Sequence, residues 1–275
     1  MARSRRRRAV VGLACVLLLL QPGCATLETR QEEEIGRDAS RELRRELDFV
    51  RDEWVVDYVE DIGRRIIAAA GPQPFEYHFY VVEDESLNAF ALPAGYIYIH
   101  TAIIMEAANV SELAGVIGHE VGHVALHHVA RNYNRQRNTG IVYQLLSVVA
   151  SIFVGGYAAA GGQMLGELAA VAYVNQFTRE AEEEADAFAV EMLPKAGYDP
   201  NGLVTFFDTM KLQSGGDSGA PTFLSSHPAT DDRIQSTAAL IADATLVPGL
   251  RTDDGGQLEI IQRRIQLLTR RADAR

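Results

Sequence analysis

His119, Glu120 and His123 form the pattern His-Glu-x-x-His, which combines metal-binding side chains with a proton acceptor. Residues four apart on an α-helix lie on one face, one turn from each other, so the two imidazoles can bind one zinc ion. Glu120 would take a proton from a water molecule that the metal activates. Apolar neighbours predict that this helix is buried, where such polar side chains need partners: Val116, Ile117, Val121 and Val124.

A third ligand is required, because a catalytic zinc site has three protein ligands and a water molecule. Cysteine is excluded, since both cysteines of the chain stand at or before position 24. The acidic stretch 178–189 offers Glu182 and Asp186 four residues apart, and therefore on one helical face. One of them could bind the metal while the other orients a ligating imidazole. Spacing alone leaves three other carboxylates open as ligands: Glu180, Glu183 and Glu184.

Two further histidines, His127 and His128, follow the motif. His127 continues the row of side chains at every fourth residue and His128 comes next, so either one is a rival metal ligand. We expect both instead to cap the exposed C-terminal end of the helix, where a cationic imidazole interacts favourably with the helix dipole.

The periodicity of the apolar side chains predicts the elements that position these residues. Residues 77–82 and 95–100 alternate and are aromatic or β-branched, which is typical of strands. Asn109 and Glu112 indicate a capping box at the start of the helix that carries the motif. Two apolar rows with helical spacing predict two amphipathic helices within residues 28–70: Leu43, Leu47, Val50 and Trp54 in the first, and Val55, Val59 and Ile62 in the second.

Helical patterns return after the motif, at 167–195, 201–213, 231–242 and 257–270. Before them, residues 138–166 carry no charged side chain and are long enough for a membrane span. Glycine pairs and polar residues interrupt this run, so we expect a buried or membrane-skimming helical hairpin at about 138–175. A true membrane span is the alternative.

The first 23 residues have the features of an export signal. Five arginines precede an apolar core, 9–20, which is shorter than the roughly 20 residues of a spanning helix. The sequence that ends at Cys24 is similar to bacterial lipoprotein signals, in which this cysteine would be lipidated. We therefore expect a signal peptide at 1–23 and a periplasmic protein anchored to the outer membrane through Cys24. Signal cleavage without lipidation is the alternative.

The chain has 275 residues, a formal charge of −11, 47% hydrophobic and 23% charged residues. This composition is ordinary for a globular protein and excludes a disordered, collagen-like or coiled-coil chain. Loss of the signal would remove five arginines and no acidic residue, which leaves a charge of −16. So acidic a protein is not expected to bind nucleic acid. The remaining length fits one domain over 24–275.

Five sequence blocks occur together in an order known from one protein family: Asn88–Tyr98, His119–His123, Arg179–Asp186, Ala196–Pro200 and Ser226–Ile234. The chain resembles the HtpX/CAAX-prenyl-protease-like zinc metallopeptidase family over roughly residues 30–240. It is most similar to the periplasmic, lipoprotein-type (BepA/LoiP-like) branch, without the tetratricopeptide array of some members. The resemblance implies a predominantly helical α+β fold, namely a gluzincin-type metallopeptidase domain with a small β-sheet beside the motif helix.

The resemblance also implies a metal site and a base. One Zn²⁺ ion per chain would be held by His119, His123 and Glu182, with Glu120 as general base and acid. Asp186 would orient a ligating histidine.

Three further roles follow from the same resemblance. His227 would lie over the metal, either as a fourth ligand at rest or as a donor in the transition state, and Arg233 would support the active site. The edge strand that pairs with an extended polypeptide substrate would consist of Asn88, Ala89, Phe90, Ala91 and Leu92.

The function implied is that of a zinc-dependent endopeptidase which cleaves periplasmic or outer-membrane proteins, chiefly misfolded ones, in envelope quality control. Its expected partners are polypeptides and a membrane, reached through the lipid anchor and the apolar hairpin. The alternative is a zinc-containing chaperone or assembly factor for outer-membrane proteins, with latent proteolysis. A standing fourth ligand at His227 would favour that alternative by closing the site to water. A third reading is an integral-membrane protease that spans at 138–166.

Overall fold

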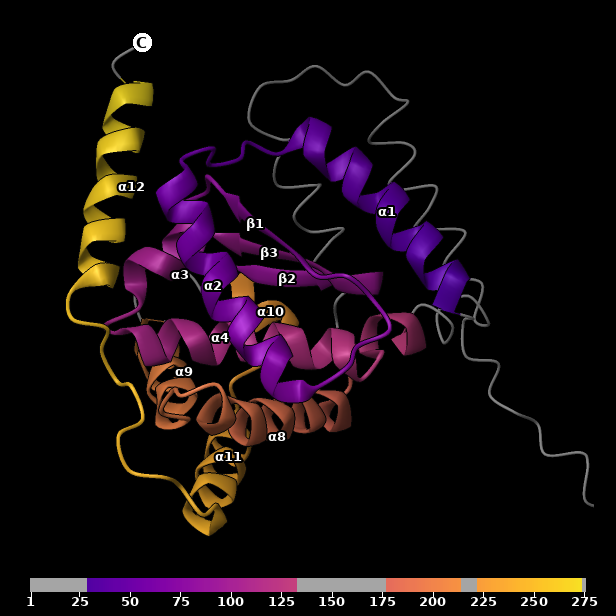
Figure 1. Cartoon of the computed structure of the whole chain (residues 1–275), viewed down its shortest axis with the longest axis vertical. Helices are drawn as coiled ribbons and strands as arrows, with labels where there is room; N and C mark the ends of the chain where they lie inside the picture. The colour runs from indigo at the N-terminus through magenta and orange to yellow at the C-terminus, as the bar shows by residue number, and fades with distance from the viewer. Residues whose placement is uncertain (1–28, 133–176, 214–221, 274–275) are drawn as a thin grey trace, which may run out of the picture.

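The computed structural model describes residues 29–132, 177–213 and 222–273. Helices predominate in this part of the chain and surround one three-stranded sheet (Figure 1), which confirms the predicted α+β class. The elements are α1 (Thr29–Glu46), α2 (Glu53–Ala70), β1 (His78–Val82), β2 (Ala89–Leu92), the 3₁₀ turn η1 (Pro93–Gly95), β3 (Tyr96–His100), α3 (Thr101–Glu106), α4 (Val110–Ala125), α8 (Arg179–Lys195), α9 (Asn201–Gln213), α10 (Thr222–Ser226), α11 (Asp231–Asp243) and α12 (Gln257–Asp273).

Helix α4 begins at the predicted capping box. The side chain of Asn109 accepts a hydrogen bond from the backbone N–H of Glu112, and the Glu112 carboxylate accepts one from the N–H of Ala108 at 2.9 Å. The first bond satisfies a backbone donor that the first helical turn leaves without a partner, and the second satisfies the N–H just before the cap. Every residue from Val110 to Val124 is buried, so α4 is the central helix of the molecule.

The sheet has the strand order β1-β3-β2, which confirms the strands predicted at 77–82 and 95–100. β1 runs parallel to β3, with His78 opposite Tyr96, and β2 runs antiparallel to β3, with Ala89 opposite Ile99. β2 is therefore an edge strand of the described sheet. One face of the sheet joins the main core with α2 and α4, and the other packs against α1.

The predicted pair of N-terminal helices is present, but its boundary was predicted wrongly. α1 ends at Glu46, and Val50 lies outside both helices, where its N–H donates to the Val81 carbonyl at the edge of β1. Trp54, placed by the pattern on the first apolar face, lies instead in the first turn of α2 and is 67% exposed. The second apolar row, Val55, Val59 and Ile62, is buried as predicted.

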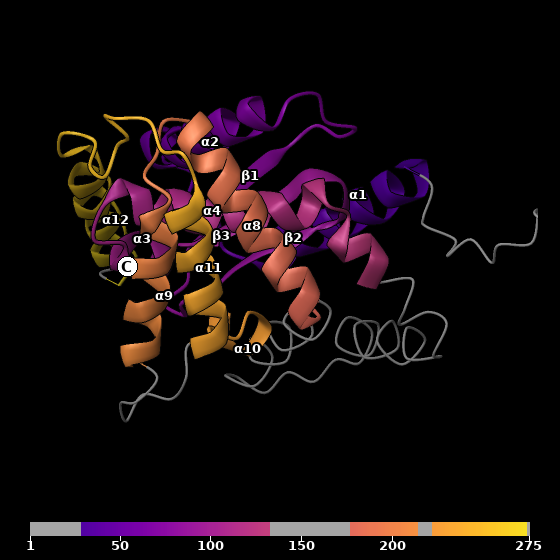
Figure 2. The ribbon, with the colours of Figure 1, turned by 90° about the horizontal axis from the view of Figure 1, so that it is seen from below.

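The elements form layers around α4 (Figure 1). The sheet and α1 lie on one side of it, α8 and α9 pack on the other side, and α2 crosses in front and contacts β1, α4 and α8. α11 packs against α8 and α9, so it lies one layer further out. The view from below in Figure 2 shows α1 and α12 at opposite ends of the molecule. The predicted helices at 201–213, 231–242 and 257–270 are confirmed by α9, α11 and α12.

Close contact between α4 and α9 depends on a glycine in α4. A Cβ atom on Gly115 would lie 2.8 Å from the backbone of Leu203 in α9. One turn later, a Cβ on Gly118 would lie 3.4 Å from the nearest atom, a side-chain carbon of Leu193 in α8. The first position has no room for a side chain, whereas the second has the spacing of ordinary contact.

Several predicted features lie outside the described residues. They are the signal peptide 1–23, Cys24, the uncharged run 138–166 and the hairpin at about 138–175. Within the described ranges, no helix combines the length and the apolar character needed to cross a bilayer.

Candidate metal centre

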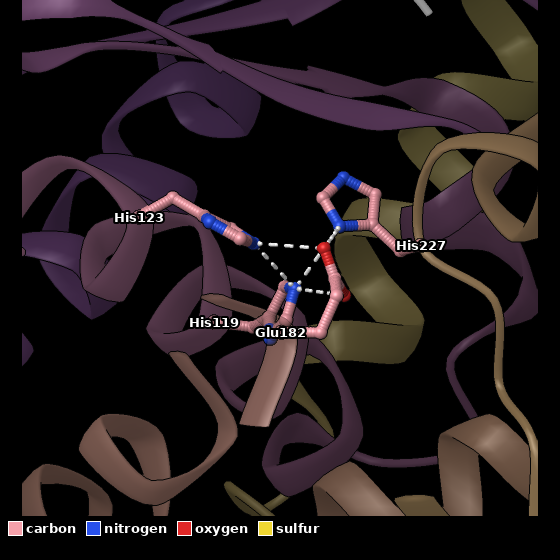
Figure 3. A group of neighbouring side chains, drawn as sticks. All are labelled: His119, His123, Glu182 and His227. Atoms are coloured by element: carbon pink, nitrogen blue, oxygen red, sulfur yellow. Dashed lines mark hydrogen bonds and ion pairs between the residues drawn. The ribbon is translucent and has the colours of Figure 1, made fainter. Parts of the chain in front are cut away.

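The two motif histidines meet on the inner face of α4. Their Nε2 atoms lie 3.0 Å apart, and both side chains are fully buried (Figure 3). This is the arrangement that the i, i+4 spacing predicts, because a turn of helix brings both rings to one point. Apolar residues of the main core surround α4 on every side, so the pair is held away from solvent.

Glu182 and His227 complete a cluster of four donors. Glu182 comes from α8, and His227 follows directly after the short helix α10 (Figure 3). His227 Nδ1 lies 2.9 Å from Glu182 Oε1 and 3.1 Å from His119 Nε2. The carboxylate in turn lies 3.4 Å from His123 Nε2. The ligand atoms of all four residues fall within 4.8 Å of one another.

These distances fit a tetrahedral metal ion. Zinc bonds to nitrogen or oxygen of about 2.0–2.1 Å place neighbouring ligand atoms about 3.3 Å apart in a tetrahedron. The observed separations of 2.9–3.4 Å between these ligand atoms lie close to that value. Such crowding of nitrogen and oxygen atoms in a buried site is unfavourable unless protons or a cation lie between them. The four side chains are therefore suited to hold one metal ion.

Asp186 and Arg233 lie next to the cluster and form a buried ion pair. Asp186 Oδ1 lies 2.8 Å from His119 Nδ1, the ring nitrogen that faces away from the cluster. Arg233 donates to both oxygens of Asp186, at 2.5 and 2.7 Å, and its Nη1 lies 2.7 Å from Glu182 Oε2. All of these side chains are at most 4% exposed. Arg233 thus places one positive charge between two buried carboxylates, where it offsets part of their repulsion.

The cluster controls where protons bind. Burial opposes a charge on His119, yet its hydrogen bonds to Asp186 and Glu182 outweigh burial and raise its pKa to about 9. Burial and the neighbouring His119 hold the pKa of His123 well below its usual range. For Glu182, burial is outweighed by the charges of His227 and Arg233, so its pKa is also well below its usual range. Without an ion, Glu182 is ionised and His123 neutral, as metal ligands must be, whereas His119 carries a proton that a bound metal ion would displace.

Glu120 lies beside the cluster without belonging to it. It is fully buried, and among the described residues neither of its carboxylate oxygens has a hydrogen-bond partner. His227 Nε2 lies 3.6 Å away and also has no such partner in the described part. Burial raises the pKa of Glu120 above its ordinary value. A buried carboxyl group with raised proton affinity can accept a proton and later release it.

The other acidic candidates of α8 do not reach the cluster. Glu180 is exposed, and Glu183 pairs with Arg179 on the surface. Glu184 lies 2.9 Å from His128 Nε2 and accepts a hydrogen bond from Arg131. Of the five carboxylates that the spacing left open, the structure brings Glu182 into the cluster and Asp186 next to it.

The expectation that His127 and His128 cap the end of α4 was wrong. α4 ends at Ala125, and His127 adopts a left-handed backbone conformation with φ of 54°. His127 Nδ1 pairs with the buried carboxylate of Glu32 in α1 at 2.9 Å. His128 turns back into the interior, where its Nδ1 lies 2.9 Å from His123 Nδ1. Burial lowers the pKa of His128 to about 4, so this histidine is neutral rather than cationic.

The strand predicted at 88–92 is present as β2, which begins one residue later at Ala89. Ala89, Phe90, Ala91 and Leu92 pair with β3 along one side only within the described sheet. The backbone carbonyl of Asn88 accepts a hydrogen bond from His100, while its buried side-chain oxygen has no partner among the described residues. β2 also packs against α4, which carries the motif.

The fold and the site together define a class of protein. A buried His-Glu-x-x-His helix, a glutamate from a second helix and a small sheet beside them characterise an α+β metallopeptidase domain of the gluzincin type. Residues 53–241 match the family model described as peptidase family M48. The chain belongs to peptidase family M48.

Curated relatives agree with this family. The chain is 32% identical to the beta-barrel assembly-enhancing protease of Yersinia pestis over 216 residues, which cover 76% of this chain and 44% of that protein. It is 34% identical to the metalloprotease LoiP of Escherichia coli K12, over 59% of this chain and 61% of LoiP. The mitochondrial metalloendopeptidase OMA1 of Schizosaccharomyces pombe is 27% identical, over 68% of this chain and 53% of OMA1. The chain spans less than two thirds of the length of these relatives.

Proposed function

We propose that the protein is a zinc-dependent endopeptidase formed by a single domain over residues 24–275. The observation that carries this proposal is the buried cluster of His119, His123 and Glu182 with the carboxylate of Glu120 beside it. M48 peptidases are metal-dependent, and two imidazoles with one carboxylate are a set of ligands that zinc prefers at catalytic sites. One Zn²⁺ ion per chain accounts for the four donors.

Each residue of the site has a separate part in this proposal. A bound zinc ion would supply Lewis acidity, which polarises a peptide carbonyl and acidifies water. Glu120 takes a proton from the attacking water molecule and passes it to the amine that leaves. Asp186 holds His119 through its outer nitrogen, and Arg233 keeps Asp186 and Glu182 ionised. In this proposal, His227 donates a hydrogen bond to the substrate oxygen as its negative charge develops.

β2 is proposed to hold the substrate. An extended polypeptide can add to the free edge of a sheet through backbone hydrogen bonds. Ala89–Leu92 form such an edge of the described sheet next to α4, and Asn88 directly precedes them. Because backbone bonds do not depend on side chains, this mode suits substrates of varied sequence in an unfolded state.

We place the activity in the bacterial envelope. The chain begins with features of an export signal, and a lipidated Cys24 would tether it to the outer membrane from the periplasmic side. Contact of the apolar hairpin at about 138–175 with the membrane is part of the same proposal. A relative at 32% identity is named for enhancing β-barrel assembly. The proposed substrates are therefore misfolded periplasmic or outer-membrane proteins.

Replacement of Glu120 by Gln tests the mechanism. The amide keeps the size of the side chain but cannot accept the proton, so we expect cleavage of an unfolded polypeptide to fall at least about 100-fold. Bound zinc, measured by atomic absorption, should stay at one ion per chain. Glu183→Gln, a change at an exposed glutamate of α8, is the matched control and should cleave like the wild type. Full proteolysis by Glu120→Gln with normal metal content would contradict the proposal.

A second candidate function is that of a zinc-containing chaperone or assembly factor for outer-membrane proteins, with latent proteolysis. The observation that favours it is the position of His227, which is fully buried and contributes its Nδ1 to the cluster. Four protein donors leave no position for water on a tetrahedral ion, as in structural zinc sites.

His227→Ala separates the two functions. If His227 closes the site of a latent protease, its removal should increase the cleavage of unfolded outer-membrane proteins several-fold. If His227 serves as a donor in the transition state of an active protease, cleavage should fall instead. Absence of cleavage by both the wild type and the variant, with binding of the unfolded proteins retained, would support the chaperone.

A further inference from the structure

A chain of hydrogen-bonded side chains leads from the metal centre to the surface. His123 Nδ1 lies 2.9 Å from His128 Nδ1, and His128 Nε2 lies 2.9 Å from Glu184 Oε2. Arg131 donates to the same carboxylate oxygen at 2.7 Å. The two histidines are buried, whereas the side chains of Glu184 and Arg131 are about half exposed. His123 is the only member of this chain that belongs to the cluster of four donors.

The positions of the protons along this chain follow from its two ends. His123 faces the cluster with Nε2, so its Nδ1 must carry the proton and donate to His128 Nδ1. His128 then accepts with Nδ1 and carries its own proton on Nε2, from which it donates to the carboxylate of Glu184. Only one tautomer of each ring satisfies both contacts.

Stacking alone does not fix the His123 ring in this way. Its imidazole lies against Phe177 with the ring centroids 3.8 Å apart and the planes 16° from parallel. That contact restricts the plane of the imidazole. It is equally satisfied after the ring turns over, so that its other face lies against Phe177. The hydrogen bond from Nδ1 distinguishes these orientations, because it forms only when Nε2 points to the other donors.

We propose that His128 is a positioning residue of the metal centre, which holds His123 with its Nε2 directed at the ion, and that Glu184 holds His128 in turn. His128 contacts Nδ1 of His123, just as Asp186 contacts Nδ1 of His119. In both cases the partner binds the ring nitrogen that faces away from the cluster. The left-handed conformation of His127 lets the chain turn back after α4 so that His128 reaches this place. The inference rests on the metal centre of the proposed function but not on peptidase activity.

Three substitutions at position 128 separate the two contacts. His128→Asn keeps an acceptor close to the place of Nδ1 but does not reach Glu184. His128→Gln reaches toward Glu184 but has no acceptor near Nδ1. His128→Phe fills the space without either contact. Loss of an outer partner of a ligating histidine weakens metal binding by about 10–100-fold. We expect that loss for the Phe and Gln variants, and an affinity within about threefold of the wild type for His128→Asn.

The readout is zinc affinity of the full chain, measured by competition with a chromogenic chelator. The visible absorption spectrum of the cobalt(II)-substituted protein is recorded beside it, since it changes when a ligating ring moves. Glu184→Ala should weaken binding by a smaller factor, about 3–10-fold, because His128 remains in contact with His123. Glu183→Ala, the neighbouring glutamate that pairs with Arg179, is the matched control and should leave affinity and spectrum unchanged.

Equal affinities and spectra for the wild type and His128→Phe would overturn the inference. Equal losses in the Asn and Gln variants would overturn it too, because a residue that only fills space does not distinguish them. The comparison of His128→Asn with His128→Gln therefore tests the inference even if His128→Phe does not fold. If the wild type itself binds no zinc, the proposed function fails, a result distinct from failure of His128 alone.

Discussion

Arg233 allows two acids to stay ionised in the interior of the protein. Its guanidinium contacts Asp186 and Glu182, and it lies 4.5 Å from the centroid of the Phe207 ring. An unpaired buried charge costs several kcal/mol, and a buried guanidinium between two carboxylates offsets part of that cost. No guanidinium of the described residues lies within ion-pair distance of Glu120. Asp186 and Glu182, which contact Arg233, are therefore suited to orient or bind, whereas Glu120 can hold a proton.

Asp84 gives a prediction for the dependence of stability on pH. Its Oδ1 accepts a hydrogen bond from the N–H of Ser86 and lies 3.5 Å from His100 Nδ1. Burial opposes ionisation, but these contacts outweigh it and lower the pKa of Asp84 from 3.8 to about 2. Because the folded state has the lower pKa, the contribution of Asp84 to stability is complete above pH 4 and is lost as the pH falls toward 2.

Asp84→Asn should therefore remove about 1–2 kcal/mol of unfolding free energy at pH 5 and less at pH 2.5. Urea denaturation at the two pH values measures this difference. Asp57→Asn, at an exposed position of α2, should follow the wild type at both. A loss of equal size at pH 5 and pH 2.5 would show that Asp84 does not act through its charge.

Part of the site could be predicted from residue types and spacing. The i, i+4 geometry of a helix fixes the relation of His119 to His123 and of Glu182 to Asp186, and the structure has both pairs as expected. His128 could not be found in this way. Its contact with His123 depends on the left-handed turn at His127, a conformation that histidine adopts less often than glycine or asparagine. If the helical periodicity of α4 is simply continued past its end, His128 is predicted at the exposed end of the helix instead.

At the scale of elements, α4 is fixed from both sides. Helices α8 and α9 pack on one side and the sheet packs on the other, so the motif histidines cannot shift without disturbing one of them. The closest approach is the contact of Gly115 with the backbone of Leu203 in α9. Backbone atoms cannot rotate away as a side chain does, so this contact sets the distance between the two helices.

Gly115→Ala should destabilise the protein, and Gly118→Ala should not. The first change places a methyl group 2.8 Å from backbone, and overpacking of this kind costs about 1–3 kcal/mol. The second places it at ordinary contact distance, where the better helix propensity of alanine contributes up to about 1 kcal/mol. Guanidinium denaturation of the two variants measures the difference. Equal stabilities would mean that α9 moves aside without cost.

The boundary between α1 and α2 shows why the sequence predicts elements better than their ends. Leu43, Leu47, Val50 and Trp54 continue a helical period across residues that are not helical. The chain leaves the helix because Phe49 and Val50 pair with the edge of β1, a contact between segments about thirty residues apart. Local periodicity contains no information about that pairing. The capping box at Asn109 was predictable because its hydrogen bonds are local.

At the scale of the whole molecule, the metal centre links parts of the chain that are distant in sequence. His119 and His123 belong to α4, Glu182 to α8, and His227 to the segment after α10. A ligand that binds the folded state alone stabilises it by RT ln(1 + [L]/Kd). The ion should therefore stabilise the packing of these helices as well as the site itself.

Removal of zinc should lower the melting temperature of the whole protein in one transition. At a free zinc concentration 100 times the dissociation constant, the expected stabilisation is about 2.7 kcal/mol. Differential scanning calorimetry with zinc and with a chelator measures it. His123→Ala, which lacks one ligand, should respond much less to the chelator. An unchanged melting temperature of the wild type would contradict a metal that binds the four donors.

The wide spacing of the donors along the chain has a consequence for biosynthesis. A ribosome adds residues from the N-terminus, so His119 and His123 leave it long before Glu182, and His227 emerges later still. Arg233, which keeps Asp186 and Glu182 ionised, comes after all of them. An unfinished chain that ends before residue 227 cannot assemble the four donors. The growing polypeptide can therefore bring all four donors together only when most of it has been made.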